Sequence, residues 1–201
     1  MNNNIELIFD FVSPNAYLIW QPLKALAEEH GATIDVTPVF LGGMHKLTGN
    51  APPMIRDAEV KGKNEYAMLE MTRFIKKHGL HKWQMNPGFP FNSIALQRML
   101  IAVGPERRAD LIDALLAGIW EQKMNVTDLA AMGKLLQDGG FNPQDLMVMT
   151  QKPEIKQELV DNTQRAVDRG GFGIPTIFVG DQMFFGKERL GQIADLLNTL
   201  D

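Results

Sequence analysis

The order in which strand-like and helix-like segments follow one another constrains the fold of this chain more than any other feature. Residues 5–11 form a short apolar run with two-residue periodicity, residues 14–29 carry apolar side chains at helical spacing, and residues 33–40 alternate and are β-branched. A strand, a helix and a second strand in this order predict a βαβ unit with parallel strands and a right-handed crossover. Residues 1–40 are therefore expected to form half of an α/β domain.

The middle of the chain, from about Leu41 to Arg169, has a different pattern, in which helical segments are separated by Gly, Pro and Asn. We expect helices near residues 57–77, 93–103 and 105–123, with Pro105 and Pro143 in first helical turns and Thr127 and Asn142 as N-caps. A loop is expected before these helices, and it contains Gly42, Gly43, Gly49, Pro52 and Pro53.

Strand signals return after residues 170–173. Residues 174–179 and 183–185 read as two strands joined by a Gly180-Asp181 turn, and an amphipathic helix follows from about Glu188 to Leu200. A β-hairpin and a closing helix would complete the sheet that the first 40 residues begin. The predicted organisation is thus an α/β domain formed by residues 1–40 and 170–201, with residues 41–169 as an all-helical insertion domain.

The chain contains no cysteine, which limits its chemistry. It therefore forms no disulfide and no thiolate metal site, and any sulfur chemistry requires a thiol from outside. The turn Ser13-Pro14-Asn15-Ala16 follows the first strand and resembles the Cys-Pro-X-Cys turn of thiol oxidoreductases. An alcohol and a methyl group stand where the two thiols would be. No metal is assigned, because His78 and His81 have no further ligand at a recognisable spacing and read as exposed residues at a helix end.

Charge and the N-terminal residues restrict the partners and location of the protein. The net charge is -4, and basic and acidic residues are intermixed, so a nucleic acid partner is not expected. Residues 1–4 lack the positive charge of a signal peptide, and Glu6 and Asp10 interrupt the apolar stretch that follows. We expect no membrane partner and a cytoplasmic location.

Ser13 has two interpretations. A serine followed by proline is an ordinary N-cap and N1 pair, which would require no further role. The helix also begins at the carboxyl end of a parallel strand, where open α/β sheets bind ligands and where the helix dipole favours an anion. A hydroxyl at that position could hold a bound thiolate and lower the pKa of its thiol.

Two other motifs are ambiguous in the same way. In Gly173-Ile174-Pro175-Thr176, the proline is either cis, which would leave the backbone of Ile174 free to pair with an extended peptide, or an ordinary trans proline at a strand edge. Lys63, Tyr66, Glu70 and Arg73 share one helix face, either as solvated residues with a structural Glu70–Arg73 pair or as part of a binding site.

Taken together, these motifs resemble a known family. Over essentially its full length the chain is similar to the glutathione-dependent branch of the DsbA-type thioredoxin superfamily, the 2-hydroxychromene-2-carboxylate isomerases and kappa-class glutathione transferases. The segments that carry the resemblance, in order, are Phe9-Asp10-Phe11-Val12-Ser13-Pro14-Asn15-Ala16-Tyr17-Leu18, Gly49-Asn50-Ala51-Pro52-Pro53, Lys63-Asn64-Glu65-Tyr66 with Arg73, Phe89-Pro90-Phe91-Asn92-Ser93, Gly173-Ile174-Pro175-Thr176 and Phe184-Phe185-Gly186-Lys187-Glu188-Arg189-Leu190.

The resemblance implies a thioredoxin-like, DsbA-like fold and a set of glutathione-binding residues. Ser13 would hydrogen-bond the glutathione sulfur, Asn50 would face the same site, and the backbone of Ile174, before a cis Pro175, would pair with the cysteinyl unit. Glu188 would receive the ammonium of the γ-glutamyl end. Lys187 replaces a small polar residue more usual there and either reaches a carboxylate or points to solvent. Lys63 would bind the glycyl carboxylate of glutathione or an anionic substrate.

The resemblance also implies an activity. It predicts a glutathione-dependent isomerase that acts on a small aromatic-derived acid, with glutathione as cosubstrate, and a homodimer. A kappa-like transferase that conjugates electrophiles would use the same site. A non-catalytic thioredoxin-like module that binds an extended peptide is the alternative from another class, and loss of both motif thiols would suit it.

Overall fold

A computed structural model describes residues 4–200 and places four strands in one sheet. The strands are β1 (Asn4–Phe9), β2 (Thr33–Pro38), β3 (Thr176–Val179) and β4 (Gln182–Phe185), in the order β2-β1-β3-β4. As predicted, β1 and β2 are parallel, with Leu7 opposite Val36, and β3 and β4 form an antiparallel hairpin. The two halves of the sheet meet where β3 pairs with β1 in antiparallel register.

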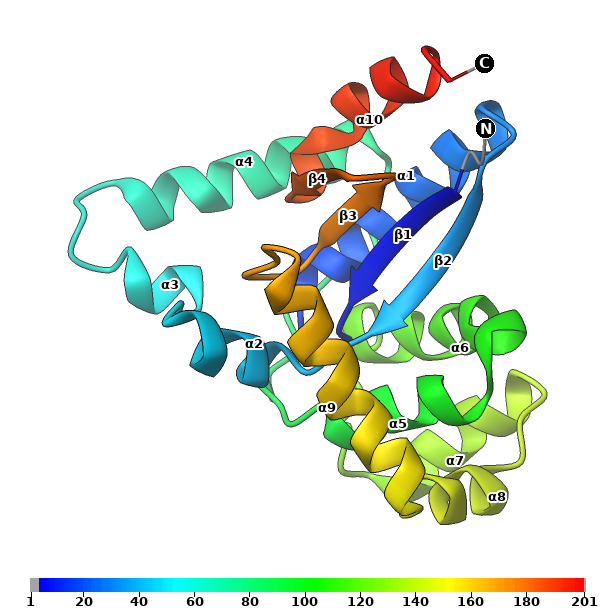
Figure 1. The fold of residues 1–201 in the computed structure, drawn as a ribbon. Coiled ribbons are helices and arrows are strands. Elements are labelled where there is room, and N and C mark those ends of the chain that lie inside the picture. Colours follow the sequence, from blue (N-terminus) through cyan, green and yellow to red (C-terminus); the bar gives the residue numbers. More distant parts are fainter. Residues whose placement is uncertain (1–3, 201) are drawn as a thin grey trace.

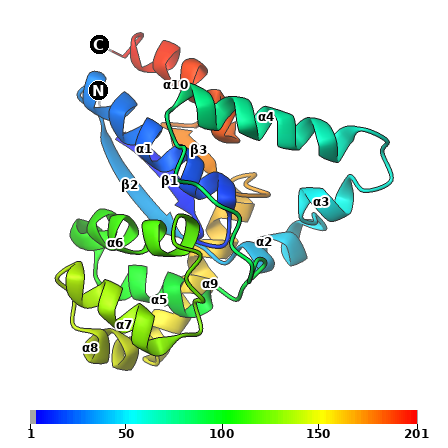
Figure 2. The same cartoon turned by 180° about the vertical axis from the view of Figure 1, so that it is seen from behind.

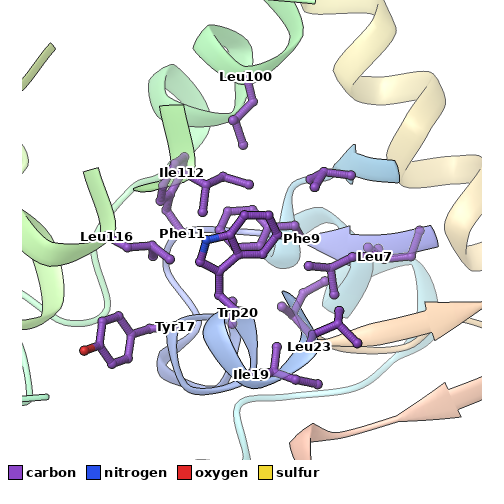
Figure 3. Packing of buried hydrophobic residues seen from close by; sticks show 14 of the residues in the cluster. Leu7, Phe9, Phe11, Tyr17, Ile19, Trp20, Leu23, Leu100, Ile112 and Leu116 are labelled. Carbon is purple, nitrogen blue, oxygen red and sulfur yellow. The ribbon is translucent and has the colours of Figure 1, made fainter. Parts of the chain in front are cut away.

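Helix α1 (Pro14–Glu29) lies across one face of this sheet, and α10 (Leu190–Leu197) packs beside it (Figures 1 and 2). The core between α1 and the sheet is aromatic. The rings of Phe9 and Phe11 meet edge to face with centroids 5.0 Å apart, and Trp20 packs edge-on against Phe9 (Figure 3). All three side chains are buried, so the end of β1 and the start of α1 are held on a rigid base.

The remaining helices lie between β2 and β3 in the sequence. Most of them gather beyond the ends of β1 and β2, as Figure 1 shows. Their bounds are α2 (Leu41–Thr48), α3 (Pro53–Arg56), α4 (Lys63–Lys77), α5 (Ile94–Ala102), α6 (Arg108–Trp120), α7 (Leu129–Asp138), α8 (Pro143–Met149) and α9 (Pro153–Asp168), with the short 3₁₀ turn η1 (Pro105–Arg107) before α6. A second 3₁₀ turn, η2 (Lys187–Arg189), lies between β4 and α10.

Some sequence predictions for this region were wrong. Residues expected as a loop form α2, because burial of Met44 outweighs the weak helix propensity of its two glycines. Helix α4 begins at Lys63 rather than at residue 57, after turns that end at Gly62 with a positive φ of 83°. Asp128, not Thr127, caps α7 by accepting hydrogen bonds from two amides. The predicted cap Asn142 is confirmed.

Helices α3 and α4 form an arm that projects from the rest of the molecule in both views (Figures 1 and 2). The arm carries several large apolar side chains that are each 47% exposed or more, namely Met54, Ile55, Val60, Tyr66, Met68 and Leu69. Within α3 and α4, the one buried residue is Phe74, near the C-terminal end of α4.

Residues 1–3, on which the expected absence of a signal peptide partly rests, lie outside the described part. Within residues 4–200, no helix is both long enough and apolar enough to cross a membrane.

Candidate functional site

Ser13 lies between the end of β1 and the first turn of α1. Its side chain is 4% exposed and accepts no hydrogen bond from the amides of α1, although the residue occupies the N-cap position. Its hydroxyl instead donates to the backbone carbonyl of Ile174, with 3.3 Å between the two oxygens. The hydroxyl therefore does not act as a simple helix cap, and it is held at the N-terminus of a 16-residue helix, where the helix dipole stabilises negative charge.

The Ile174–Pro175 segment joins Ser13 to the turn after β4. The peptide bond between these two residues is cis. The carbonyl of Pro175 accepts a hydrogen bond from the amide of Gly186 at 3.0 Å, which places the neighbouring Lys187 and Glu188 next to the same loop. Turn η2 also packs on α1. The fold thus brings residues from both ends of the chain to one place.

Lys187 is buried, with 3% of its surface exposed, and its ammonium donates to carboxylates on two elements. One is Glu70 of α4, at 2.6 Å, and the other is Glu188. The Lys187 ammonium also lies 5.3 Å from the ring centre of Phe74. The Lys187 side chain therefore does not point to solvent, and its ammonium is occupied by two carboxylates of the protein itself.

The pKa values of Glu70 and Glu188 shift in opposite directions. Burial raises the pKa of Glu70, and the neighbouring Glu188 adds to this effect. Burial also acts to raise the pKa of Glu188, but hydrogen bonds from Lys187 and Glu70 and the lysine charge outweigh it, so this pKa is lowered. Glu188 is thus the more acidic carboxyl group of the pair.

The expected pair between Glu70 and Arg73 does not form. Glu70 turns to Lys187, which the fold supplies from far along the chain, while Arg73 lines a cavity of about 200 Å³ between α4 and the start of α10. His78 lies at the same cavity, half-buried against the ring of Phe74 with centroids 4.3 Å apart, so the prediction that it is exposed was wrong. His81 is exposed, as predicted.

Asn50 lies just after α2 and contacts the segment that leads to Ile174. Its amide nitrogen donates to the carbonyl of Phe172 at 2.8 Å. Its side-chain oxygen accepts from its neighbour's amide and from Arg56 at 3.4 Å. Asn50 therefore contacts the residue that directly precedes the Gly173-Ile174-Pro175 motif.

Lys63 is connected to Asn50 only indirectly. Its ammonium donates to Asp57 at 2.9 Å, and Arg56 binds the same carboxylate through two nitrogens. The hydrogen bonds from Arg56, with the help of Lys63, hold the pKa of Asp57 well below its usual range. Lys63 remains half-exposed, with 49% of its side chain accessible. The structure places it at the edge of the arm rather than against Ser13.

Sequence reasoning missed the residues that hold the Ser13 turn in place. Gln97 of α5 is fully buried and donates to the carbonyls of Phe9 and Val39, at 2.6 and 2.9 Å. The indole of Trp120 donates to the carbonyl of Phe11 at 3.1 Å. The glutamine within the apolar run of α5 could have indicated this role, because a buried side-chain amide requires hydrogen-bond partners that are also buried.

Asp10 is the other missed residue, and it is fully buried three positions before Ser13. Its carboxylate accepts hydrogen bonds from the amides of Val12 at 3.1 Å and Leu41 at 2.8 Å, so it links the Ser13 turn to the start of α2. Burial raises its pKa to about 6, although both amides act in the opposite direction. The side-chain oxygen of Asn15, beside the turn, is buried and has no partner among residues 4–200.

Comparison with known proteins gives consistent relatives along the whole chain. The profile of the DSBA-like thioredoxin domain matches residues 4–198. A 2-hydroxychromene-2-carboxylate isomerase of Sphingobium xenophagum is 28% identical over 200 residues, which cover 98% of this chain and 99% of that protein. An isomerase of the same name from Pseudomonas putida is 25% identical and covers 98% and 95%. Glutathione S-transferase kappa 1 of Homo sapiens is 24% identical and covers 96% and 90%.

Solved structures agree with these matches. A structure of a 2-hydroxychromene-2-carboxylate isomerase is similar with a TM-score of 0.84 at 23% identity, over 98% of this chain and 95% of the other. A probable DsbA oxidoreductase from Streptomyces coelicolor gives a TM-score of 0.72 at 15% identity, over 98% and 88%. The predicted DsbA-like thioredoxin fold with helices inserted between its two halves is confirmed.

Proposed function

This chain belongs to the DSBA-like thioredoxin domain family, and from that premise we propose that it is a glutathione-dependent isomerase of the 2-hydroxychromene-2-carboxylate isomerase type. One observation carries the proposal. In a chain without cysteine, a buried serine hydroxyl stands at the N-terminus of α1, where the related oxidoreductase turn would present a thiol. A hydroxyl and a helix dipole suit a thiolate that arrives with a cosubstrate.

The proposed reaction uses that thiolate as a reversible nucleophile. The sulfur of glutathione adds to a conjugated carbon of the ring-opened acid, and the double bond that it attacks becomes a rotatable single bond. The electron pair moves onto the conjugated carbonyl oxygen. After rotation, that pair returns, the carbon–sulfur bond breaks and the thiolate is regenerated, so there is no net oxidation or reduction. Ser13 would donate a hydrogen bond to the sulfur before addition and after elimination.

Several other residues would bind glutathione in this proposal. The backbone of Ile174 would pair with the cysteinyl unit, and Asn50 would support that segment through its bond to Phe172. Glu188 would meet the γ-glutamyl ammonium, which has to share the carboxylate with Lys187. Lys63, half-exposed at the edge of the arm, would receive the glycyl carboxylate or the acid substrate.

A kappa-like glutathione transferase is the second candidate, and the kappa-class relatives favour it. It would use the same thiolate but stop after addition. The two activities differ in the fate of the adduct, and an assay that follows both substrate conversion and glutathione consumption separates them.

We also propose that the protein is a homodimer that associates through the arm. The proposal rests on the run of exposed apolar side chains on α3, α4 and the turns between them, which includes Ile55 at 66% and Tyr66 at 60% exposure. Several large apolar side chains exposed on one projecting element are costly in water and typical of a protein interface. A second copy supplies the same apolar surface, so two arms can cover each other around a twofold axis.

The test of the activity follows absorbance of 2-hydroxychromene-2-carboxylate with and without glutathione, in the native protein and in Ser13→Ala. Conversion that requires glutathione and falls about 100-fold or more in Ser13→Ala supports the isomerase. Thr72→Ala is the matched control, because it also removes a hydroxyl that donates to a backbone carbonyl, but on the exposed face of α4. Glutathione consumption without isomerisation would favour the transferase, and absence of glutathione binding would favour the peptide-binding module.

A further inference from the structure

Helix α9 passes α2 and α5 (Figures 1 and 2). A second cavity, of about 300 Å³, is lined by residues of these three helices. We propose that it binds a small organic acid with an apolar body, at a site separate from Ser13. The proposal goes beyond the isomerase activity, because no lining residue of this cavity is one of the residues that surround Ser13.

The walls of the cavity are mainly apolar. They include the side chains of Phe40, Leu47, Ile94, Leu159 and Val160. Leu47 and Val160 are 51% and 60% exposed, so the cavity opens to solvent with apolar side chains at its mouth. A volume of about 300 Å³ is at the small end of ligand pockets and fits a body of one or two rings.

The charges at this cavity are all of one sign. Lys46 of α2, Arg98 of α5 and Lys156 of α9 line it, whereas the lining within the described residues includes no Asp or Glu. None of these three cations forms an ion pair with a carboxylate in residues 4–200. Three cations from three different helices around one apolar cavity repel one another, and an anion bound among them would relieve that repulsion.

Arg98 gives the most specific indication that the cavity suits an anion. Its Nε is buried and has no hydrogen-bond partner among the residues that the structure describes. A buried donor on a charged group is costly unless an acceptor meets it, and a carboxylate is the acceptor that a guanidinium binds best. The two uncharged polar side chains in the wall already have partners. The hydroxyl of Thr163 accepts from the amide of Phe40 and donates to the carbonyl of Leu159, and the amide nitrogen of Gln164 donates to Asp168.

The apolar walls and the three cations together define the ligand class. A carboxylate would meet Arg98 and one of the lysines, and its ring or short alkyl body would cover the leucine and isoleucine side chains. A neutral molecule of the same shape could accept a hydrogen bond from Arg98 but would leave the repulsion among the three cations unrelieved. A phosphate without an apolar body would leave the walls hydrated.

The experiment measures binding of 2-naphthoate to the full chain by isothermal titration calorimetry. The uncharged 2-naphthamide, which has nearly the same shape, is the ligand control. We expect the acid to bind at least about tenfold more tightly than the amide, because only the acid carries a charge for Arg98. Arg98→Gln and Lys156→Gln should each weaken naphthoate binding about fivefold or more.

Two control variants show whether a loss of naphthoate binding is specific to this cavity. Lys82→Gln removes one exposed positive charge outside the cavity and should leave naphthoate affinity unchanged. Ser13→Ala should also leave it unchanged. Lys156 lies near the protein surface, so its variant tests the site even if Arg98→Gln fails to fold.

Three results would overturn the proposal. They are absence of naphthoate binding, equal affinity for the acid and the amide, and loss of binding in Ser13→Ala with no effect of Arg98→Gln or Lys156→Gln. The last result would place the acid at the Ser13 site instead. The isomerase assay is separate, so failure of this cavity to bind an acid leaves the proposed activity unaffected.

Discussion

The hydroxyl of Ser13 donates to the backbone carbonyl of Ile174, a residue 161 positions further along the chain. This contact joins the turn before α1 to the residue before Pro175. The serine proposed to hold a thiolate and the backbone proposed to hold the rest of the cosubstrate are therefore neighbours in the folded chain. Because a hydroxyl has a single proton, Ser13 has to release this carbonyl when it donates to a thiolate, and the Ile174 carbonyl is then free to accept from the cosubstrate.

Removal of the Lys187 ammonium should destabilise the protein in a pH-dependent way. In Lys187→Met, Glu70 and Glu188 would remain close together without the cation that both now contact. We expect the free energy of unfolding to fall by about 1–3 kcal/mol at pH 7. The loss should be smaller near pH 4, because protonation of one carboxylate removes their repulsion. Urea unfolding of the native protein and of Lys187→Met at both pH values measures this difference in the free energy of unfolding.

The double variant Glu70→Gln/Lys187→Met is the control for this mechanism. It removes one of the two like charges, so it should recover part of the stability lost in Lys187→Met at pH 7. Equal stability of Lys187→Met and the native protein at pH 7 would show that the buried ammonium has no net stabilising effect.

Asp10 should make the protein less stable as the pH rises. Its pKa is about 6 in the folded protein and 3.8 ordinarily, so between these pH values the folded state keeps a proton that the unfolded state has lost. Stability therefore decreases as the pH increases through this range, by up to about 3 kcal/mol from this group. In Asp10→Asn this contribution should vanish, so the stability difference between variant and native protein should favour the variant more at pH 7 than at pH 4.

Asp138→Asn serves as the comparison for Asp10→Asn, because Asp138 is an exposed partner of Lys134. The free energy of unfolding of Asp138→Asn should show the same pH dependence as that of the native protein. A parallel pH dependence in native protein and Asp10→Asn would mean that the Asp10 carboxyl titrates normally.

The arm should control assembly. Ile55→Glu places a charge within the proposed dimer surface and should convert a dimer into a monomer with an unchanged fold. Val148→Glu is closely matched, because Val148 on α8 is 67% exposed and Ile55 is 66% exposed, but it lies away from the arm. Light scattering coupled to size-exclusion chromatography measures the molecular mass of the native protein and of both variants. A native monomer, or a dimer that survives Ile55→Glu, would contradict the arm as the interface.

Lys63 should affect ligand binding more than folding. Arg56 keeps two hydrogen bonds to Asp57 when Lys63 is removed, so Lys63→Ala should leave the thermal unfolding midpoint nearly unchanged. If Lys63 binds a carboxylate of glutathione, the dissociation constant should rise about fivefold or more in the variant. Lys61→Ala, exposed on the same arm, is the matched control. Equal glutathione affinity in the native protein, Lys63→Ala and Lys61→Ala would show that Lys63 contacts Asp57 but does not bind glutathione.

Local patterns in the sequence were sufficient for the sheet. Two-residue periodicity predicted β1, alternation and β-branching predicted β2, and strand signals on both sides of the Gly180-Asp181 turn predicted β3 and β4. The family resemblance predicted the cis bond before Pro175. Helix α2 was not predicted, because Gly42 and Gly43 lower its propensity. The features that stabilise it are tertiary, namely burial of Met44 and the hydrogen bond from its first amide to Asp10.

The candidate site shows the same limit. Spacing along α4 suggested a Glu70–Arg73 pair, whereas the partner of Glu70 is Lys187, 117 positions away. Gln97 and Trp120 hold the Ser13 turn from the inserted helices, and no local pattern connects them to it. Contacts of this kind depend on how the insertion packs on the sheet, which periodicity does not encode.

The central claim is that Ser13 and the N-terminus of α1 hold the glutathione thiolate, and the most direct measurement is the pKa of the thiol of bound glutathione. Ultraviolet absorbance of the thiolate follows it in a pH titration of the native complex and of the Ser13→Ala complex. We predict a pKa at least about one unit below the ordinary thiol value of about 8.5 in the native complex, and a return toward that value in the variant. A bound thiol that titrates like free glutathione, or a lowered pKa that Ser13→Ala leaves unchanged, would contradict the claim.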